Sequence, residues 1–166
     1  FAHFAVNGIV YTMVTCLTAE RIEINNDVVS IGNSTFTGSK TTEFIINGDV
    51  ATIKKDAGTG SELENIQISG SVGTIEEQAF AGCTNLQTFD VGSIESIGYR
   101  SFYLCSNLST VNIPGLKTLG IGAFRSCTSL TEIDLMSIVS IDDNAFITMG
   151  SVMGVYGQGF EALSKV

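Results

Sequence analysis

Residues 108–130, LSTVNIPGLKTLGIGAFRSCTSL, decide the fold, because their apolar positions recur along the chain at a fixed interval. Starting from this segment, columns of equivalent residues continue in both directions with one common 22-residue period. The columns are Phe80, Phe102, Phe124 and Phe146; Cys83, Cys105 and Cys127; Ile75, Ile97, Leu119 and Ile141; and Leu86, Leu108, Leu130 and Val152. Several independent columns with one period identify a repeat protein.

The same columns extend toward the N-terminus, with more departures. Phe36 lies two periods before Phe80, and the strand column continues through Ile22, Phe44 and Ile66. The intervening repeat has Gly58 where the others have Phe, within KKDAGTGSE at 54–62, so we expect a loop there in place of the regular turn. The strand column has seven positions, the last at 155–157.

Each 22-residue unit, here called a rung, changes its hydrophobic period halfway. Ala79, Phe80 and Cys83 have helical spacing, whereas Phe89 and Val91 alternate as in a strand. No rung can bury its apolar residues alone, so the rungs must stack. The prediction is an α/β leucine-rich-repeat solenoid of about seven rungs, with parallel strands on one face and short helical turns on the other.

The chain is predicted to form one domain over residues 1–166. Asn7-Gly8 is a strong hairpin signal between two β-prone segments, so residues 1–21 are expected to form an N-terminal β-hairpin cap. The repeats would occupy 22–157, followed by a C-terminal segment at 158–166. Residues 1–19 carry no charge, but Asn, Gly and Thr interrupt their apolar run, so we expect no membrane insertion.

The motif at 108–130 resembles the BspA-like leucine-rich repeat, whose consensus is LxxVxIPxxLxxIGxxAFxxCxxL. The resemblance is strong over 72–152 and looser over 22–71; Gly58 replaces the consensus Phe, and Ser39 and Met149 replace the Cys. The opening residues also resemble the NGI-x-Y hairpin that often precedes such arrays. The resemblance implies a secreted or surface-anchored protein of anaerobic bacteria or mucosal protists, serving adhesion, host-protein binding or co-aggregation.

Composition argues against several classes of partner. The 166 residues include 8 basic and 17 acidic side chains, for a formal net charge of −9. No cluster of Lys or Arg is present to neutralise phosphates, so neither nucleic acid nor an anionic membrane surface is expected to bind.

The sequence also gives no sign of catalysis. His3 is the only imidazole and is expected to lie outside the repeats, so no base stands beside a nucleophile. The aligned cysteines are a full repeat apart, unlike the closely spaced ligands of zinc sites, and are expected to stack as buried free thiols, with Cys16 left over. Gly32–Lys40 misses the phosphate-loop spacing, and the acidic pairs 76–77 and 142–143 suit the start of a helical turn. We therefore expect no catalytic residue, cofactor or metal.

Binding is then expected on the outward side of the strands. Asp90, Asn112 and Asp134 should form a row with spacings of about 4.8 Å. The candidate ligand-binding residues are Gln67, Thr88, Asp90, Thr110, Asn112, Glu132 and Asp134. This acidic strip would suit a basic protein segment or a hydroxyl-rich glycan, although a simply solvated sheet face is the alternative. Tyr99, Arg100 and Tyr103 form a competing candidate on the turns.

The sequence thus favours a non-enzymatic module at the cell surface or outside the cell. It would mediate protein–protein interaction or adhesion by binding a protein or glycan of a host or neighbouring cell. The alternative is a structural spacer or an appendage repeat within a larger surface protein or surface enzyme.

Overall fold

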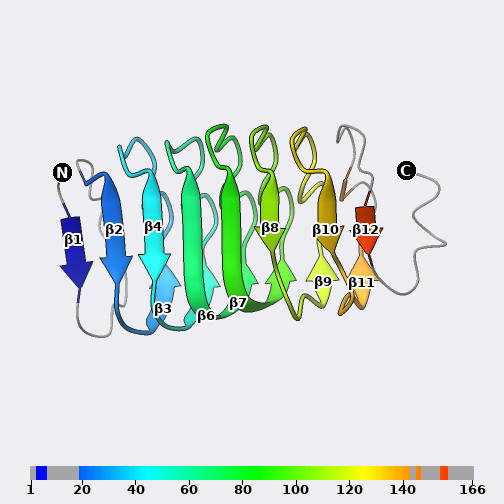
Figure 1. The fold of residues 1–166 in the computed structure, drawn as a ribbon, viewed down its shortest axis with the longest axis horizontal. Helices are drawn as coiled ribbons and strands as arrows, with labels where there is room; N and C mark the ends of the chain where they lie inside the picture. The colour runs from blue at the N-terminus through cyan, green and yellow to red at the C-terminus, as the bar shows by residue number, and fades with distance from the viewer. Residues whose placement is uncertain (1–2, 7–18, 143–144, 147–153, 157–166) are drawn as a thin grey trace.

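The computed structural model describes residues 3–6, 19–142, 145–146 and 154–156, which form a solenoid built from parallel β-strands (Figure 1). Each rung has two strand positions. The first position is occupied by β1 (His3–Val6), β2 (Arg21–Ile24), β4 (Glu43–Ile46), β6 (Asn65–Ile75), β7 (Thr88–Ile97), β8 (Thr110–Asn112), β10 (Glu132–Asp134) and β12 (Gly154–Tyr156). The second is occupied by β3 (Val28–Ile31), β5 (Val50–Ile53), the later parts of β6 and β7, β9 (Thr118–Leu119) and β11 (Ser140–Ile141).

Strand pairing confirms the repeat interval. Ile22 pairs with Phe44 and Phe44 with Ile66, both in parallel and each exactly one period further along the chain. Between β6 and β7 the paired residues are one position further apart in the sequence, as Ile66 pairs with Phe89. After a bulge the regular period returns, with Ser71 opposite Ser93. In Figure 1 the strands of the first position run downward in front, and those of the second position return behind them. The second strand position was not predicted.

The number of rungs is slightly smaller than predicted. All seven predicted strand positions fall in strands, namely β2, β4, β6, β7, β8, β10 and β12. Counted from β2 to β12, these strands enclose about six turns of the solenoid rather than about seven, and β1 precedes them as a further strand. The parallel-strand part of the predicted architecture is therefore confirmed, with a small correction to its length.

The predicted short helical turns are wrong, because the part of the chain that the structure describes contains no helix. In the turn at 76–83, alternate N–H groups bond in different directions. Phe80 N–H donates to the Ser101 carbonyl of the next rung at 2.8 Å, whereas Cys83 N–H donates to the Phe80 carbonyl of its own turn at 3.2 Å. A helix would keep all of these bonds within one rung.

Backbone dihedrals explain the difference from a helix. Two positions in each turn have a positive φ, which a right-handed helix cannot accommodate. Over the five turns between residues 34 and 126 these positions recur once in each rung: Ser34, Asp56, Gln78, Arg100 and Gly122 at the first, and Gly38, Gly60, Gly82, Leu104 and Ser126 at the second.

The expected loop at 54–62 is also wrong, because this segment forms the same turn as its neighbours. Gly58 N–H donates to the Ala79 carbonyl of the next rung at 2.6 Å, as Phe80 does one rung later. A Cβ added at Gly58 would lie 2.7 Å from Cδ1 of Phe80. The missing Phe is therefore compensated by the Phe80 ring, which occupies the space beside Gly58.

The core contains the predicted Phe and Cys columns. The rings of Phe102 and Phe124 stack with centroids 5.1 Å apart, and Phe80 and Phe146 extend the stack on either side. Phe146 is only partly buried, because it lies at the end of the column. Cys83, Cys105 and Cys127 are buried free thiols, as predicted.

At the N-terminus, β1 pairs in parallel with β2, with His3 opposite Arg21. His3 therefore lies within the array, contrary to the prediction. The Asn7-Gly8 turn of the expected hairpin, Cys16 and the C-terminal segment at 158–166 fall outside the described residues.

Candidate functional site

The outward side of the first strand position, here called the strand face, contains the predicted ligand-binding residues. Five of them line one shallow hollow of about 440 Å³ that crosses β2, β4, β6, β7 and β8: Gln67, Thr88, Asp90, Thr110 and Asn112. The parallel pairing of β6 with β7 and of β7 with β8 brings these residues together from three successive rungs.

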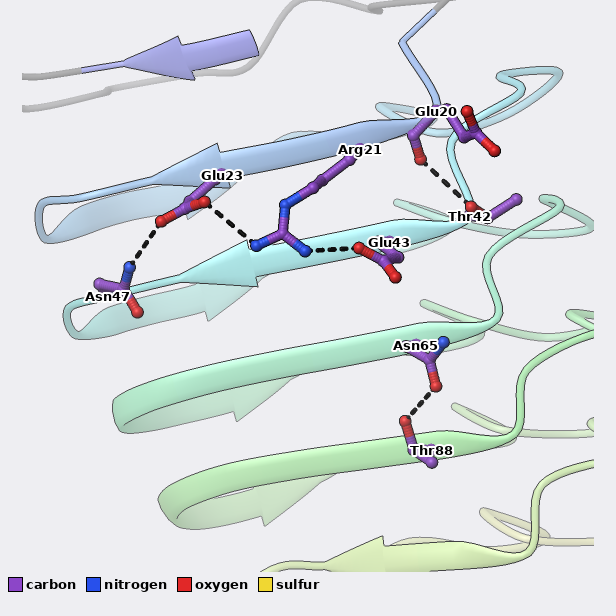
Figure 2. Close-up of polar contacts among 8 residues, drawn as sticks. All are labelled: Glu20, Arg21, Glu23, Thr42, Glu43, Asn47, Asn65 and Thr88. Carbon is purple, nitrogen blue, oxygen red and sulfur yellow. Dashed lines mark hydrogen bonds and ion pairs between the residues drawn. The ribbon is translucent and has the colours of Figure 1, made fainter. Parts of the chain in front are cut away.

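Hydrogen bonds between rungs hold the polar side chains of this hollow. Thr88 Oγ1 donates to Asn65 Oδ1 at 2.6 Å (Figure 2). Asn112 Nδ2 donates to Asp90 Oδ1 at 2.7 Å, so the predicted Asp90–Asn112 row is present. Each of these bonds joins neighbouring strands, and together they restrict the side chains to defined positions.

Glu132 and Asp134 lie across an interruption in the strand face. The described strands show no pairing between β8 and β10; β10 pairs with β12 instead. Both residues line a second hollow, of about 300 Å³, between β8 and β10, and Thr110 borders both hollows. Asp134 accepts a hydrogen bond from its own Met136 N–H at 2.8 Å rather than continuing the row through Asn112.

Charged residues that the sequence prediction missed lie at the other end of the larger hollow. The Arg21 guanidinium donates to both Glu43 and Glu23, as Figure 2 shows. The hydrogen bond to Glu43 is the main reason that the pKa of Arg21 is raised, with Glu23 adding to it. The offset of one full period between Arg21 and Glu43 was the signal that could have identified this pair.

Hydrogen bonding also stabilises the charged form of two carboxylates that lie outside the first strand position. The backbone N–H and the hydroxyl of Ser71 both donate to Asp49, which lowers the pKa of Asp49. The Lys117 ammonium lies 2.9 Å from Glu95 and lowers the pKa of that carboxyl. Both groups are therefore ionised at neutral pH, which adds to the negative charge of the chain.

The three aligned thiols have no access to solvent. Cys105 Sγ lies 3.2 Å from the Phe80 carbonyl oxygen, to which it donates. Burial is the main cause of a raised pKa for Cys105, so its nucleophilic thiolate form is disfavoured. Within the described ranges, no group of three or more His, Cys, Asp or Glu side chains is arranged to hold a metal ion.

The competing candidate residues come together on the turns, away from the strand face. The guanidinium carbon of Arg100 lies 4.9 Å from the ring centre of Tyr99 and 5.2 Å from that of Tyr103. The predicted cluster is thus present as a cation–π group.

Comparison with known families bears on the whole array. A family model, the BspA type leucine rich repeat region, matches in six copies over residues 10–115 and 58–156. The chain belongs to the BspA-type leucine-rich repeat family. No curated protein and no solved structure matches it.

The BspA-type repeat accounts for the regularly spaced columns of the core. BspA-type leucine-rich repeats are typically associated with surfaces and adhesion. Over the described ranges, no helix is long and apolar enough to cross a membrane.

Proposed function

We propose that this BspA-type domain is a non-enzymatic interaction module at the cell surface or outside the cell. It binds a protein or glycan of a host or neighbouring cell through the strand face. The observation that carries the proposal is the hollow of about 440 Å³ across five strands, lined by hydrogen-bonding side chains from successive rungs.

The charge of the strand face indicates the class of ligand. Asp90 borders the larger hollow, and Glu132 and Asp134 border the neighbouring one. These carboxylates, in a chain of net charge −9, favour a basic protein segment. The hydroxyl and amide groups of Thr88, Thr110 and Asn112 also suit a hydroxyl-rich glycan. Because the contacts are exposed, binding should weaken as salt is raised.

Neutralising the two aspartates tests this proposal while preserving their shape. Asn at position 90 retains an oxygen that can accept the Asn112 hydrogen bond. We expect the double variant Asp90→Asn/Asp134→Asn to bind immobilised extracellular-matrix proteins or glycans about tenfold more weakly at low salt, through loss of two favourable charge contacts.

The matched control is Glu62→Gln/Glu77→Gln, which removes the same charge from the turns. Glu62 and Glu77 form ion pairs with Lys40 and Lys55 there. The control should bind like the wild type. Equal losses in the two double variants, or no loss in the aspartate variant, would contradict a site on the strand face.

A structural spacer is the second candidate, alone or as an appendage to a larger surface protein or surface enzyme. The observation that favours it is the row of ion pairs and hydrogen bonds between successive rungs, such as Lys54 with Glu76 and Lys117 with Glu95, which stiffens the array. Under this account the wild-type domain binds none of the matrix proteins or glycans. Replacing it with an unrelated rigid repeat of equal length would then preserve the activity of the full-length protein.

A further inference from the structure

A second surface lies on the turns at 98–104 and 120–126, which belong to the set of turns at the top of Figure 1. We call it the turn patch, and it consists of Tyr99, Arg100, Tyr103, Leu104, Ile121 and Arg125. Arg100 stacks on both Tyr rings, and the Arg125 guanidinium carbon lies 6.0 Å from the centre of the Tyr103 ring. Two guanidinium groups therefore share one aromatic platform.

These two arginines differ from the other basic residues that the structure describes. Each of the others forms an ion pair with a carboxylate: Arg21, Lys40, Lys54, Lys55 and Lys117. Neither Arg100 nor Arg125 has a carboxylate within 4.0 Å among the described residues. In an acidic chain, this leaves two cations available to an external anion.

The patch also exposes apolar side chains on a strained backbone. Leu104 has a φ of 62° at the position that Gly38, Gly60 and Gly82 occupy in other rungs. A left-handed conformation is unfavourable for Leu, yet this residue stays 43% exposed, so only part of its apolar surface is packed within the chain. Ile121, in the next rung, is 46% exposed. Backbone strain at a largely exposed apolar residue is typical of a surface used for binding.

We propose that the turn patch binds an acidic segment of a partner protein, with the carboxylates on Arg100 and Arg125 and an apolar side chain against Leu104 and Ile121. Planar guanidinium groups favour carboxylates because they can donate two parallel hydrogen bonds. The exposed Leu and Ile favour a peptide over an acidic glycan, whose ring hydroxyls gain nothing from aliphatic contact. This ligand has the opposite charge to the one proposed for the strand face, and the two sites share no residue.

The probe is a fluorescein-labelled peptide with the sequence GELEELEG, and fluorescence anisotropy at low salt measures its dissociation constant. We expect Arg100→Gln/Arg125→Gln to weaken binding at least about tenfold, as expected for loss of two charge-assisted contacts. The control Lys54→Gln/Lys55→Gln removes the same net charge from a turn two rungs away whose lysines are already paired. It should change the dissociation constant less than about twofold.

Two further variants separate charge from geometry and from apolar contact. Arg100→Lys/Arg125→Lys keeps both charges but loses the planar donors, and we expect binding about three- to fivefold weaker than wild type. Leu104→Gly should also weaken binding several-fold, because it removes an apolar contact. Circular dichroism of each variant checks the fold. If the glutamine variant does not fold, the lysine variant decides, and its unchanged affinity would overturn the proposal.

Three other results would also overturn it. The first is a wild-type domain that does not bind the peptide. The second is an equal loss of peptide affinity in Arg100→Gln/Arg125→Gln and in Lys54→Gln/Lys55→Gln, which would mean that the peptide responds to net charge alone. The third is tighter binding of an acidic oligosaccharide than of the peptide, which would assign the turn patch to a glycan. Failure of the strand-face experiment leaves the turn patch unaffected, because the aspartate variants leave these residues unchanged.

Discussion

The turns at 54–60 and 98–104 have the same backbone but different side chains. Gly58 N–H and Phe102 N–H occupy equivalent positions and donate to the next rung at 2.6 and 2.8 Å. In the first turn the Phe column holds Gly58, and Lys54 and Lys55 pair with glutamates one rung away. In the second turn a buried Phe102 fills the core, while Arg100 lacks a carboxylate partner among the residues described.

The comparison shows that stacking determines the path of the chain, whereas the side chains determine what each turn can bind. Alternate backbone N–H groups of both turns donate to the following rung, so each rung serves as a template for its neighbour. A rung can then lose its aromatic residue if the next ring fills the space. The first turn pairs its lysines with glutamates of the next rung, whereas the second leaves Arg100 without a carboxylate partner among the described residues.

The largest effect is expected at the Phe stack of the second turn. Phe102 is fully buried, between Phe80 and Phe124 and against Phe89. Phe102→Ala should lower the free energy of unfolding by about 3–5 kcal/mol, because it opens a cavity between rungs. Chemical denaturation measures the change. Tyr99→Ala, on the same turn but exposed, is the control and should cost less than about 1 kcal/mol.

A smaller effect of opposite sign is expected at Leu104. Leu104→Gly would give this turn the residue found at Gly60 in the first turn. The substitution should relieve about 1–2 kcal/mol of left-handed strain. The greater freedom of Gly in the unfolded chain offsets about 0.5–1 kcal/mol of this gain, so the free energy of unfolding should rise slightly. Thermal unfolding provides the measurement. A large loss of stability would show that Leu104 packs within the domain, which would weaken the assignment of this residue to a binding surface.

The smallest effect is expected at the paired lysines of the first turn. Lys54→Gln/Lys55→Gln removes two exposed ion pairs, whose side chains are all at least 36% exposed. Such pairs contribute about 0–1 kcal/mol each, so the loss of stability should be small and should diminish further in high salt. A loss that salt does not reduce would mean that these lysines stabilise the rung through packing.

The stacking of the rungs was predictable because several columns share one period. Over the described residues, the Phe, Cys, Ile and Leu columns form the core, and predicting them needed no knowledge of the turn geometry. The second strand position was missed because its buried residues, such as Val50 and Ile53, are three apart rather than two. This spacing hides the alternation by which strands are normally identified.

The turn geometry was misread because Ala79, Phe80 and Cys83 suit a helix equally well. The column of Gly38, Gly60 and Gly82 was the contrary signal, since Gly is typical of left-handed positions. On the strand face, the repeat period correctly placed Asp90 beside Asn112. The same period could not reveal the interruption before β10, because it treats all rungs as equivalent.

The most direct test of rung-on-rung stacking is a double-mutant cycle between Gly58 and Phe80, which occupy the same column in neighbouring rungs. A Cβ at position 58 would lie 2.7 Å from the Phe80 ring, so Gly58→Ala should cost about 1–3 kcal/mol in the wild type. In the Phe80→Val background the side chain ends at Cγ and lacks the atoms that the added Cβ would meet, so we expect the same substitution to cost less than about 1 kcal/mol. Denaturation of the four proteins measures the coupling. Additive costs would contradict stacking of these two rungs in the register described.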